Sequence, residues 1–373
     1  MNPVSALQCP SYERNLVDSA IRKAVGLLGG MEKFVRPGER VLIKPNMLAA
    51  KAPDKAVTTH PEVVRAVVRM VKDAGGIPFI GDSGAIGSFK KIAEVTGIAE
   101  VAQAEGADLI ELSEAEDVAG TGTFRHFEIS SEALHADAVI NLPKLKTHGQ
   151  MLLTLAVKNL FGCIPGRRKV QWHLNAGVDI GAFAAMLVEL HGLIRPRLSI
   201  VDAVVSMEGN GPGSGRPRET GFIMAGEDAF AVDFMLCRFL GVEPFRLPTL
   251  KAAREKGLFP ETPEIDLLGD FNAPGYAGIR DFRLPPGTHL EWTIPETVRR
   301  FLKDALTTKP RVDKGRCKLC MMCADMCPAK AMKGPGAGIE INYRQCIRCF
   351  CCQEICPYGA IDIAEGWLLR FIG

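Results

Sequence analysis

The cysteine pattern near the C-terminus constrains this chain more than any other feature. Eight cysteines fall in two runs of identical spacing, and each run ends in a Cys-Pro pair. The two runs are Cys317, Cys320, Cys323, Cys327-Pro328 and Cys346, Cys349, Cys352, Cys356-Pro357. Three thiolates placed two residues apart can wrap one metal–sulfur cube, while the fourth leaves in another direction before its proline. The spacing therefore predicts metal–sulfur chemistry in this part of the chain.

Each run has the form C-x₂-C-x₂-C-x₃-C-P, and together they resemble the bacterial ferredoxins that hold two [4Fe–4S] clusters. In such proteins the fourth cysteine of each run ligates the cluster of the other run. We therefore assign one cluster to Cys317, Cys320, Cys323 and Cys356, and the other to Cys346, Cys349, Cys352 and Cys327. The residues 327–332 and 356–361 also match each other, as expected of an internal duplication.

A pair of zinc sites is the alternative, because C-x₂-C also suits tetrahedral zinc. Four-cysteine zinc sites usually consist of two separated C-x₂-C pairs, without a third cysteine or a trailing Cys-Pro. The pattern favours iron–sulfur clusters. The remaining cysteines show no disulfide spacing, and we expect Cys351, beside Cys352, to be a packed thiol. This cysteine usage indicates a reducing cytoplasm, in an organism or niche with little oxygen.

Composition limits the classes of partner. The apolar content of 47% and charged content of 24% are typical of a soluble globular protein. A net charge of +2 gives no bulk electrostatic reason to expect a nucleic-acid or membrane partner. The N-terminus lacks a basic region followed by a long apolar one, and no apolar run reaches 18 residues. We expect a cytoplasmic protein.

At 373 residues the chain is too long for a ferredoxin alone, which needs about 60 residues. Apolar strands alternate with helical patterns over residues 1–285, which predicts an α/β domain with a mainly parallel sheet and flanking helices. Examples are strands at 40–44, 77–80, 138–141 and 198–201 and helices at 14–29, 61–74, 152–162 and 178–194. A connector at 286–312, with one helix at 295–306, leads to a small α+β ferredoxin unit at 313–364. The apolar tail at 365–373 is expected to pack on its own protein or to contact a second copy in a homodimer.

Unusual polar residues follow the predicted strands. Because ligands bind at the carboxyl ends of strands in open α/β sheets, we expect these residues to share one pocket. The candidate catalytic residues are Lys44, Asp82, Lys144, Lys146 and His148, and the candidate cofactor-binding residues are Asn46, Ser83, Lys158, Gly211 and Gly213. Prolines beside Lys44 and Lys144 fix the backbone there. For each lysine alone, a solvated surface position is the simpler interpretation.

Three further features leave alternatives open. Lys158 lies in an otherwise apolar helical pattern, so it either binds an anion or extends to water. The loop at 209–216 has alternate glycines and fits neither nucleotide fingerprint, so it is either an anion-binding nest or a surface loop. His173, in a basic segment expected to be flexible, is a weak candidate for a proton donor.

The strand-end motifs also resemble a known family, the domain of unknown function 362. The resemblance covers about residues 1–240 and rests on Lys44-Pro-Asn46, Thr59-His-Pro61, Gly81-Asp-Ser83, Asn141 to His148, Val157 to Gly162 and Met207 to Pro212. Members often carry a C-terminal dicluster ferredoxin, as this chain does. The resemblance implies the fold and the clusters, and it leaves the chemistry open.

Two functions from different classes fit these observations. In the first, two clusters pass electrons between a redox protein or low-potential donor and an anionic substrate, or a phosphate-bearing cofactor such as a flavin or deazaflavin, held by the lysines. Asp82 or His148 would handle protons. In the second, the chain is an electron carrier or an assembly and docking factor for another redox enzyme. The distance from the clusters to the strand-end pocket separates the two.

Overall fold

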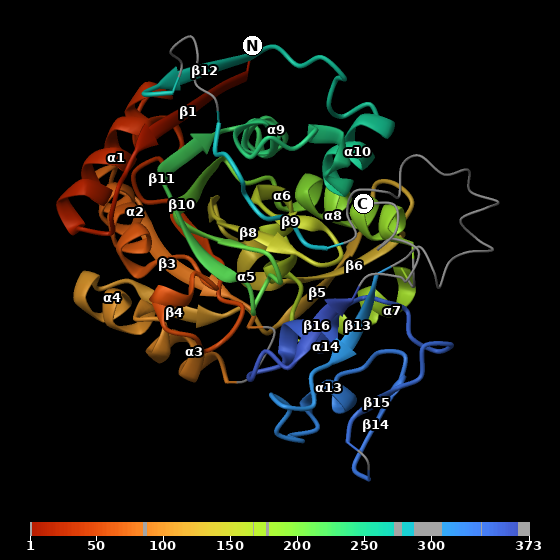
Figure 1. The fold of residues 1–373 in the computed structure, drawn as a ribbon. Coiled ribbons are helices and arrows are strands. Elements are labelled where there is room, and N and C mark those ends of the chain that lie inside the picture. Colours follow the sequence, from red (N-terminus) through yellow and green to blue (C-terminus); the bar gives the residue numbers. More distant parts are fainter. Residues whose placement is uncertain are drawn as a thin grey trace.

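The computed structural model describes residues 2–84, 88–166, 168–176, 179–271, 278–286, 308–336 and 338–364. The helix expected at 295–306 and the apolar tail at 365–373 lie outside these residues. Within the described residues, an α/β unit is followed by a small cysteine-rich unit, which packs against it at the bottom of Figure 1.

A sheet of ten strands forms the centre of the α/β unit. Its order is β12-β1-β11-β10-β7-β2-β3-β4, and β8 and β9 branch from β10. The strands are β1 (Asn2–Gln8), β2 (Arg40–Pro45), β3 (Ile77–Asp82), β4 (Asp108–Glu111), β7 (Ala138–Leu142), β8 (Lys144–His148), β9 (Leu152–Thr154), β10 (Leu198–Glu208), β11 (Arg216–Gly226) and β12 (Ile265–Gly269). The run from β10 to β4 is parallel throughout, whereas β11 is antiparallel to both of its neighbours. The prediction of a mainly parallel sheet is confirmed.

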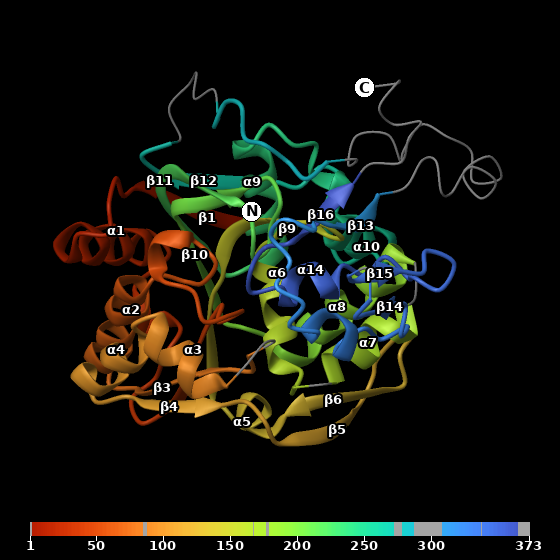
Figure 2. The same ribbon diagram turned by 60° about the horizontal axis from the view of Figure 1, so that its bottom comes forward.

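Helices cover both faces of this sheet (Figures 1 and 2). One face carries α1 (Arg14–Leu27), α2 (Pro61–Asp73), α3 (Phe89–Val95) and α4 (Ile98–Glu105); the other carries α6 (Ala156–Asn159), α8 (Ile180–Ile194), α9 (Ala229–Phe239) and α10 (Pro248–Glu255). Successive side chains of a strand point to opposite faces. Accordingly Val41 and Ile43 pack into the first core and Leu42 into the second. The α/β unit is therefore a three-layer structure.

A strand pair with a short helix, and a further helix, lie outside the central sheet and precede α8 in the chain. Strands β5 (Ala115–Ala119) and β6 (His126–Ser130) form a separate antiparallel pair, which α5 (Ser131–Leu134) follows. Helix α7 (Arg168–Ala176) occupies the segment expected to be flexible, and it buries His173. Its Trp172 stacks on Phe127 of β6, with ring centroids 5.0 Å apart. Packing of this aromatic residue explains why a basic segment is helical here.

Tertiary pairing decides the backbone at two places. Residues 144–148, which follow the predicted strand at 138–141, form a further strand, β8, which pairs with β10 and β9. The helix expected at 152–162 starts later, because Leu152–Thr154 is a strand. Asp233 of α9 accepts hydrogen bonds from the backbone N–H groups of Ala156 (2.7 Å) and Val157 (3.2 Å), and so caps α6. None of these partners is close in sequence.

The cysteine-rich unit repeats one motif twice. Its strands β13 (Lys309–Val312) and β16 (Ile361–Ala364) pair with each other, as do β14 (Met332–Lys333) and β15 (Glu340–Ile341). Each cysteine run ends in a short helix, α13 (Met322–Asp325) or α14 (Cys351–Ile355). Strand β13 lies in the segment expected to be the connector, since its backbone partner is β16. The small α+β unit expected from the sequence is present.

Helix α14 attaches the cysteine-rich unit to the α/β unit. The buried Gln353 donates hydrogen bonds from Nε2 to the carbonyl (2.9 Å) and side-chain (3.0 Å) oxygens of Asn210 and to the carbonyl oxygen of Gly211 (3.0 Å). Asn210 also donates to Asp362 (3.2 Å), and Lys51 donates to the carbonyl of Pro357 (2.7 Å). The loop that carries Gly211 and Gly213 is thus part of the contact between the units.

Replacing Gln353 by alanine is expected to loosen this contact. Three oxygens of the Asn210–Gly211 segment lose their donor, and the expected loss is about 1–3 kcal/mol. Amide hydrogen exchange of residues 351–356 should then become roughly 5- to 150-fold faster. Gln345→Ala is the matched control, because Gln345 is exposed and bonds only within its own unit. Equal protection in both variants would contradict the assigned role of Gln353.

Candidate functional site

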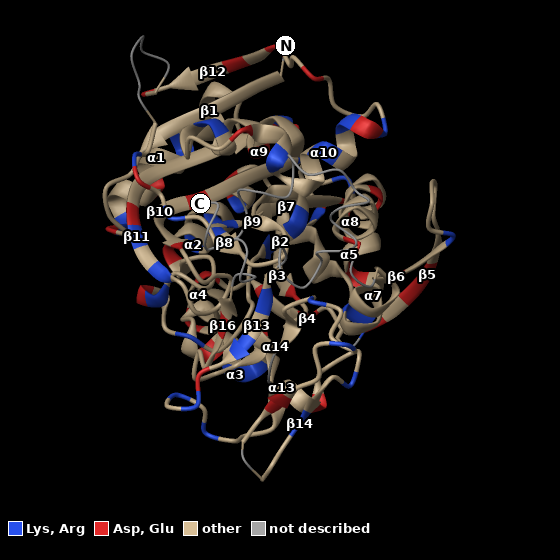
Figure 3. Ribbon diagram, turned by 45° about the vertical axis from the view of Figure 1, so that its right-hand side comes forward, with Lys and Arg blue, Asp and Glu red and all other residues tan. Residues whose placement is uncertain are grey.

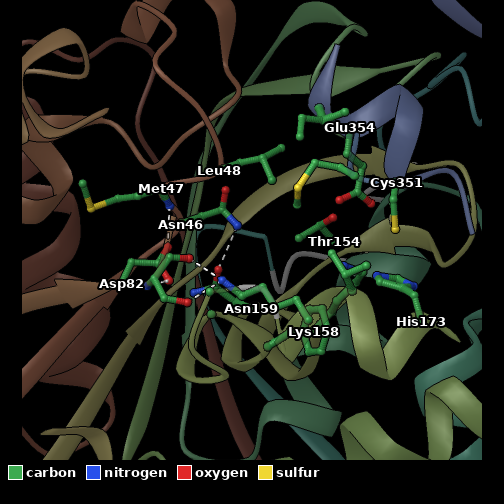
Figure 4. A pocket seen from close by; sticks show the side chains of 18 of the residues that line it. Asn46, Met47, Leu48, Asp82, Thr154, Lys158, Asn159, His173, Cys351 and Glu354 are labelled. Carbon is green, nitrogen blue, oxygen red and sulfur yellow. Dashed lines mark hydrogen bonds between the residues drawn. The ribbon is translucent and has the colours of Figure 1, made fainter. Parts of the chain in front are cut away.

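The site is a cavity between the ends of the central strands and α14. It has a volume of about 100 Å³, enough for several water molecules. The α/β unit contributes Lys44, Asn46, Asp82, Ser83, Thr154, Lys158, Asn159, Lys169 and His173, and the cysteine-rich unit contributes Met326, Cys351, Glu354 and Ile355. Figure 4 shows Glu354 and Cys351 projecting from one side and Lys158 and His173 lying opposite them. Residues from both units therefore meet around one space.

Lys44 and Asp82 form a buried ion pair at the ends of β2 and β3. Lys44 Nζ lies 3.0 Å from Asp82 Oδ1, and both side chains are almost fully buried. Asp82 also accepts hydrogen bonds from the backbone N–H groups of Met47 (2.7 Å) and Ser83 (2.9 Å). A side chain at Gly162 would collide with both charged groups, so only glycine fits there. This ion pair forms part of the cavity wall, and the charges of Lys44 and Asp82 neutralise each other.

Two of the predicted lysines, Lys144 and Lys146, do not line the cavity. Lys144 Nζ bonds Tyr12 (2.6 Å) and Asp202 (2.8 Å) in a separate buried cluster. Lys146 lies directly behind the wall, where it donates to Asn46 Oδ1 (2.9 Å) and to the carbonyl of Val57 (2.7 Å). Burial, without a carboxylate partner, lowers the pKa of Lys146 to about 7. Lys146 therefore orients Asn46, which does line the cavity.

A chain of side-chain amides continues this wall. Asn46 Nδ2 donates to Asn159 Oδ1 (3.0 Å), and Asn159 Nδ2 donates to Asn141 Oδ1 (2.8 Å). Asn141 in turn donates to the carbonyl of Ala156 (3.0 Å) and to Ser199 Oγ (3.2 Å). Each buried amide thus has a partner, as burial requires. The network connects β2, β7, β10 and α6 and makes the strand ends rigid.

His148 belongs to the contact between the units. Its Nδ1 accepts from the backbone N–H groups of Gln150 and Met151, both at 3.1 Å. The proton of the neutral ring must therefore sit on Nε2, which lies 2.8 Å from Glu354 Oε1. Burial lowers the pKa of His148 to about 4. Burial opposes the ionisation of Glu354, but His148 and Lys158 outweigh it and lower the pKa of that carboxyl. His148 fixes Glu354 in place.

Lys158 presents a positive charge without a matching acceptor. In the described part of the chain its ammonium lies over the ring of Phe161, 5.7 Å from the centroid, with no hydrogen bond or ion pair. Burial lowers the pKa of Lys158, and Lys44 adds to this effect while Glu354 and Cys351 oppose it. The sequence left open whether Lys158 binds an anion or extends to water. In the structure its side chain faces the cavity. An anion in the cavity would accept hydrogen bonds from the Lys158 ammonium.

His173 was a weak candidate from the sequence, yet it lines the cavity. It is 3% exposed, and its Nδ1 has no hydrogen-bond partner among the described residues. Phe183 stacks on the ring at 4.3 Å, and Phe161 contacts it edge-on at 5.6 Å. Burial lowers the pKa of His173 to about 3, so the ring is neutral. A buried imidazole nitrogen without a partner, facing a cavity, is suited to a bound ligand.

Several lining residues were missed in the sequence, among them Lys169, Cys351 and Glu354. Lys169 extends from α7 to both oxygens of Ser83, and burial lowers its pKa to about 8. Cys351, expected to be a packed thiol, lines the cavity. The only signal for Lys169 was its place in the basic segment 166–169, and none existed for Cys351, because helix α14 had to be placed first.

The eight remaining cysteines of the unit line two further cavities. Cys317, Cys320, Cys323 and Cys356 surround one, and Cys327, Cys346, Cys349 and Cys352 surround the other. These are the two groups of four that the spacing suggests. Backbone N–H groups of Ala331 and Ala360 point at Cys327 Sγ and Cys356 Sγ, both at 3.2 Å. Such bonds stabilise thiolate ligands.

The geometry of these cysteines fits a cluster better than a single ion. Among the described residues, no three His, Cys, Asp or Glu side chains lie close enough together to hold one metal ion. The turns between ligands use left-handed backbone at equivalent positions, namely Leu319, Met321, Arg348 and Phe350. This conformation curls each C-x₂-C segment around the cavity. The residues present therefore fit two iron–sulfur clusters.

Comparisons with known proteins agree with this architecture. The family model of the domain of unknown function (DUF362) matches residues 41–238, and that of the 4Fe–4S dicluster domain matches residues 309–357. The thylakoid-associated protein sll1697 of Synechocystis sp. is 40% identical over 312 residues, which cover 81% of this chain and 97% of that protein. No helix in the described residues combines the length and the apolar content needed to cross a membrane.

Similarity to solved structures is weak. The lactate racemase apoprotein of Thermoanaerobacterium thermosaccharolyticum aligns with a TM-score of 0.44 at 10% identity, over 63% of this chain and 56% of that one. A protein of Thermotoga maritima aligns with a TM-score of 0.36 at 9% identity, over 66% of this chain and 59% of that one. The chain thus spans little more than half of each of these structures. By its family matches, the chain belongs to the domain of unknown function (DUF362) family and carries a C-terminal 4Fe–4S dicluster domain, which makes it an iron–sulfur electron-transfer protein.

Proposed function

We propose that this protein is an oxidoreductase that exchanges electrons with a small anionic molecule bound in the cavity between its two units. One observation carries the proposal. The ammonium of Lys158, which lacks an acceptor in the described chain, faces the same space as Cys351 and Met326, the neighbours of the ligand cysteines Cys352 and Cys327. When bound, the clusters supply one-electron transfer at potentials that can be low.

The cavity residues have distinct roles in this proposal. Lys158 binds the negative charge of the ligand, and it would also stabilise charge that develops on reduction. His173 Nδ1 accepts a hydrogen bond from a donor group of the ligand, because burial keeps this ring neutral. The Lys44–Asp82 pair and the Asn46–Asn159 contact position the wall. Phe161 and Ile355 exclude bulk water from one side.

Proton handling by Asp82 or His148, suggested by the sequence, has little support. Asp82 is occupied by Lys44 and two backbone N–H groups. His148 is occupied on Nδ1 by two backbone N–H groups.

A reducing cytoplasmic location remains part of the proposal, since oxidation of the ligand thiolates would release the clusters.

A binding titration tests the proposal. The protein with both clusters in place would be titrated anaerobically with small carboxylates, inorganic phosphate, flavin mononucleotide and a deazaflavin. We expect at least one of these anions to bind at micromolar concentration. Matched neutral analogues, such as the amide of each carboxylate, should bind at least tenfold more weakly, because Lys158 selects for charge. Failure of every anion to bind at this level would favour the alternative of an electron carrier or docking factor.

A further inference from the structure

The two cysteine cavities differ in what surrounds them, and this difference suggests where a partner binds. Cys349 and Cys352 are 7% and 8% exposed, and Cys352 follows Cys351, which lines the interdomain cavity. The other group opens to solvent, since Cys320 is exposed and Lys318 and Tyr358 lie at the edge of its cavity. An external redox protein can therefore approach the group of Cys317, Cys320, Cys323 and Cys356 more closely than the group of Cys327, Cys346, Cys349 and Cys352.

The surface around Cys320 has the composition of a docking site. Leu319 and Tyr358 expose 48% and 49% of their surface there. Both contact the segment that carries the Cys317 group of cysteines, Leu319 as a neighbour of Cys320 in sequence and Tyr358 as part of the cavity lining. Exposed tyrosine and leucine beside an electron-transfer centre provide apolar contact area, which partner-binding surfaces use at their centre.

The charge of this surface is positive. Arg316 forms ion pairs with Asp313 (2.8 Å) and with Asp362, so both nearby carboxylates are already neutralised. Lys314 and Lys318 are exposed and make no hydrogen bond or ion pair within the described residues. Lys51 of the α/β unit adds a third ammonium beside Pro357. Lysine and arginine are also spread over the loops of the cysteine-rich unit at the bottom of Figure 3.

We propose that this surface, formed by Lys314, Lys318, Leu319, Cys320 and Tyr358, docks a small acidic one-electron carrier protein. Unpaired lysines around an apolar centre complement a partner whose carboxylates surround its own exposed redox group. Such complementarity mainly accelerates association and weakens as salt increases. The proposal rests on the electron-transfer role of the cysteine-rich unit, and it is independent of what binds in the interdomain cavity.

Binding of a flavodoxin, as a small acidic carrier, tests this proposal. The affinity of the protein with its clusters in place would be measured by calorimetry from about 0.1 M to about 1 M salt, over which the Debye length falls from about 10 Å to about 3 Å. The double variant Lys314→Glu/Lys318→Glu should bind the flavodoxin at least tenfold more weakly at the lower salt. The rate of electron transfer from the reduced flavodoxin should fall by a similar factor.

Two control variants test whether the loss of affinity is specific to the proposed surface. Arg125→Glu/Arg238→Glu makes the same change in net charge with exposed residues of the α/β unit, and it should leave the affinity unchanged. Leu319→Ser should weaken binding at both salt concentrations, because its contribution is apolar. Reduction by dithionite and anion binding in the cavity should stay normal in the lysine variant. Equal affinity in both double variants, or no measurable binding of the flavodoxin, would overturn the proposed docking surface without affecting the proposed cavity function.

Discussion

Replacing Cys352 by alanine is expected to abolish the response of the protein's reduction potential to an anion in the interdomain cavity. Cys352 belongs to the group formed with Cys327, Cys346 and Cys349, and two sequence neighbours of this group, Cys351 and Met326, line the cavity. An anion beside this group favours the oxidised state. Every tenfold difference in anion affinity between the two states lowers a one-electron potential by about 59 mV. Redox titration with and without the anion identified by the binding titration measures this shift.

The matched variant for this experiment is Cys317→Ala. Cys317 belongs to the group that opens to solvent, so its loss should release a similar amount of iron but preserve the anion-dependent shift. Iron analysis and circular dichroism establish that each variant keeps one cluster and its fold. A shift that survives in Cys352→Ala and disappears in Cys317→Ala would reverse our assignment of the inner and outer groups.

Replacing Lys158 by methionine should have opposite effects on binding and stability. Loss of a charged hydrogen bond to the ligand is worth about 1.5–3 kcal/mol, which weakens anion binding by roughly 10- to 150-fold. Because this ammonium has no acceptor in the described chain, its removal should leave the free energy of unfolding unchanged or raise it. Calorimetric titration and denaturant unfolding measure the two effects separately.

Lys44→Met provides the contrasting control. It breaks the buried pair with Asp82, so we expect unfolding to become easier by about 3–5 kcal/mol. Lys158→Arg keeps the charge and should retain most of the affinity. If Lys158→Met lowered stability as much as Lys44→Met, Lys158 would be part of the structural wall and not a ligand anchor.

The pH dependence of anion binding follows from the same residue. The ammonium must be protonated to bind an anion, and burial lowers the pKa of Lys158 below its ordinary value of 10.5. Affinity should therefore be full at low pH and fall as pH rises through this lowered pKa, earlier than for an exposed lysine. Lys158→Arg should move the loss to higher pH, because arginine stays protonated.

The cluster ligands and the layers of the fold could be predicted from the sequence, because both depend on local patterns. Cluster ligands are set by short-range spacing, so the eight cysteines and their division into two groups were visible in the sequence. The parallel α/β layers were visible too, because strand and helix periodicities are local. The structure has a cavity at the strand ends, where the sequence predicted a polar site, and ligand binding there stays a prediction.

The identity of the cavity residues was less visible. Lys44, Lys144 and Lys146 look equivalent in the sequence, but their acceptors are Asp82, Asp202 and Asn46, which lie far away along the chain. Pairing with these partners makes the three lysines structural. Among the described residues, Lys158 Nζ and His173 Nδ1 have no hydrogen-bond partner, and such an absence has no sequence pattern.

The sequence alone therefore determined the cofactor class and the layered fold, and it predicted a polar site at the strand ends. Only the tertiary structure decided which charges are compensated and which are free, because ion pairs form between elements that the fold brings together. It also decided the position of α14 across the strand ends, through the contacts of Gln353 and Glu354. That position turns Cys351 from a surplus thiol between two ligands into part of the cavity wall.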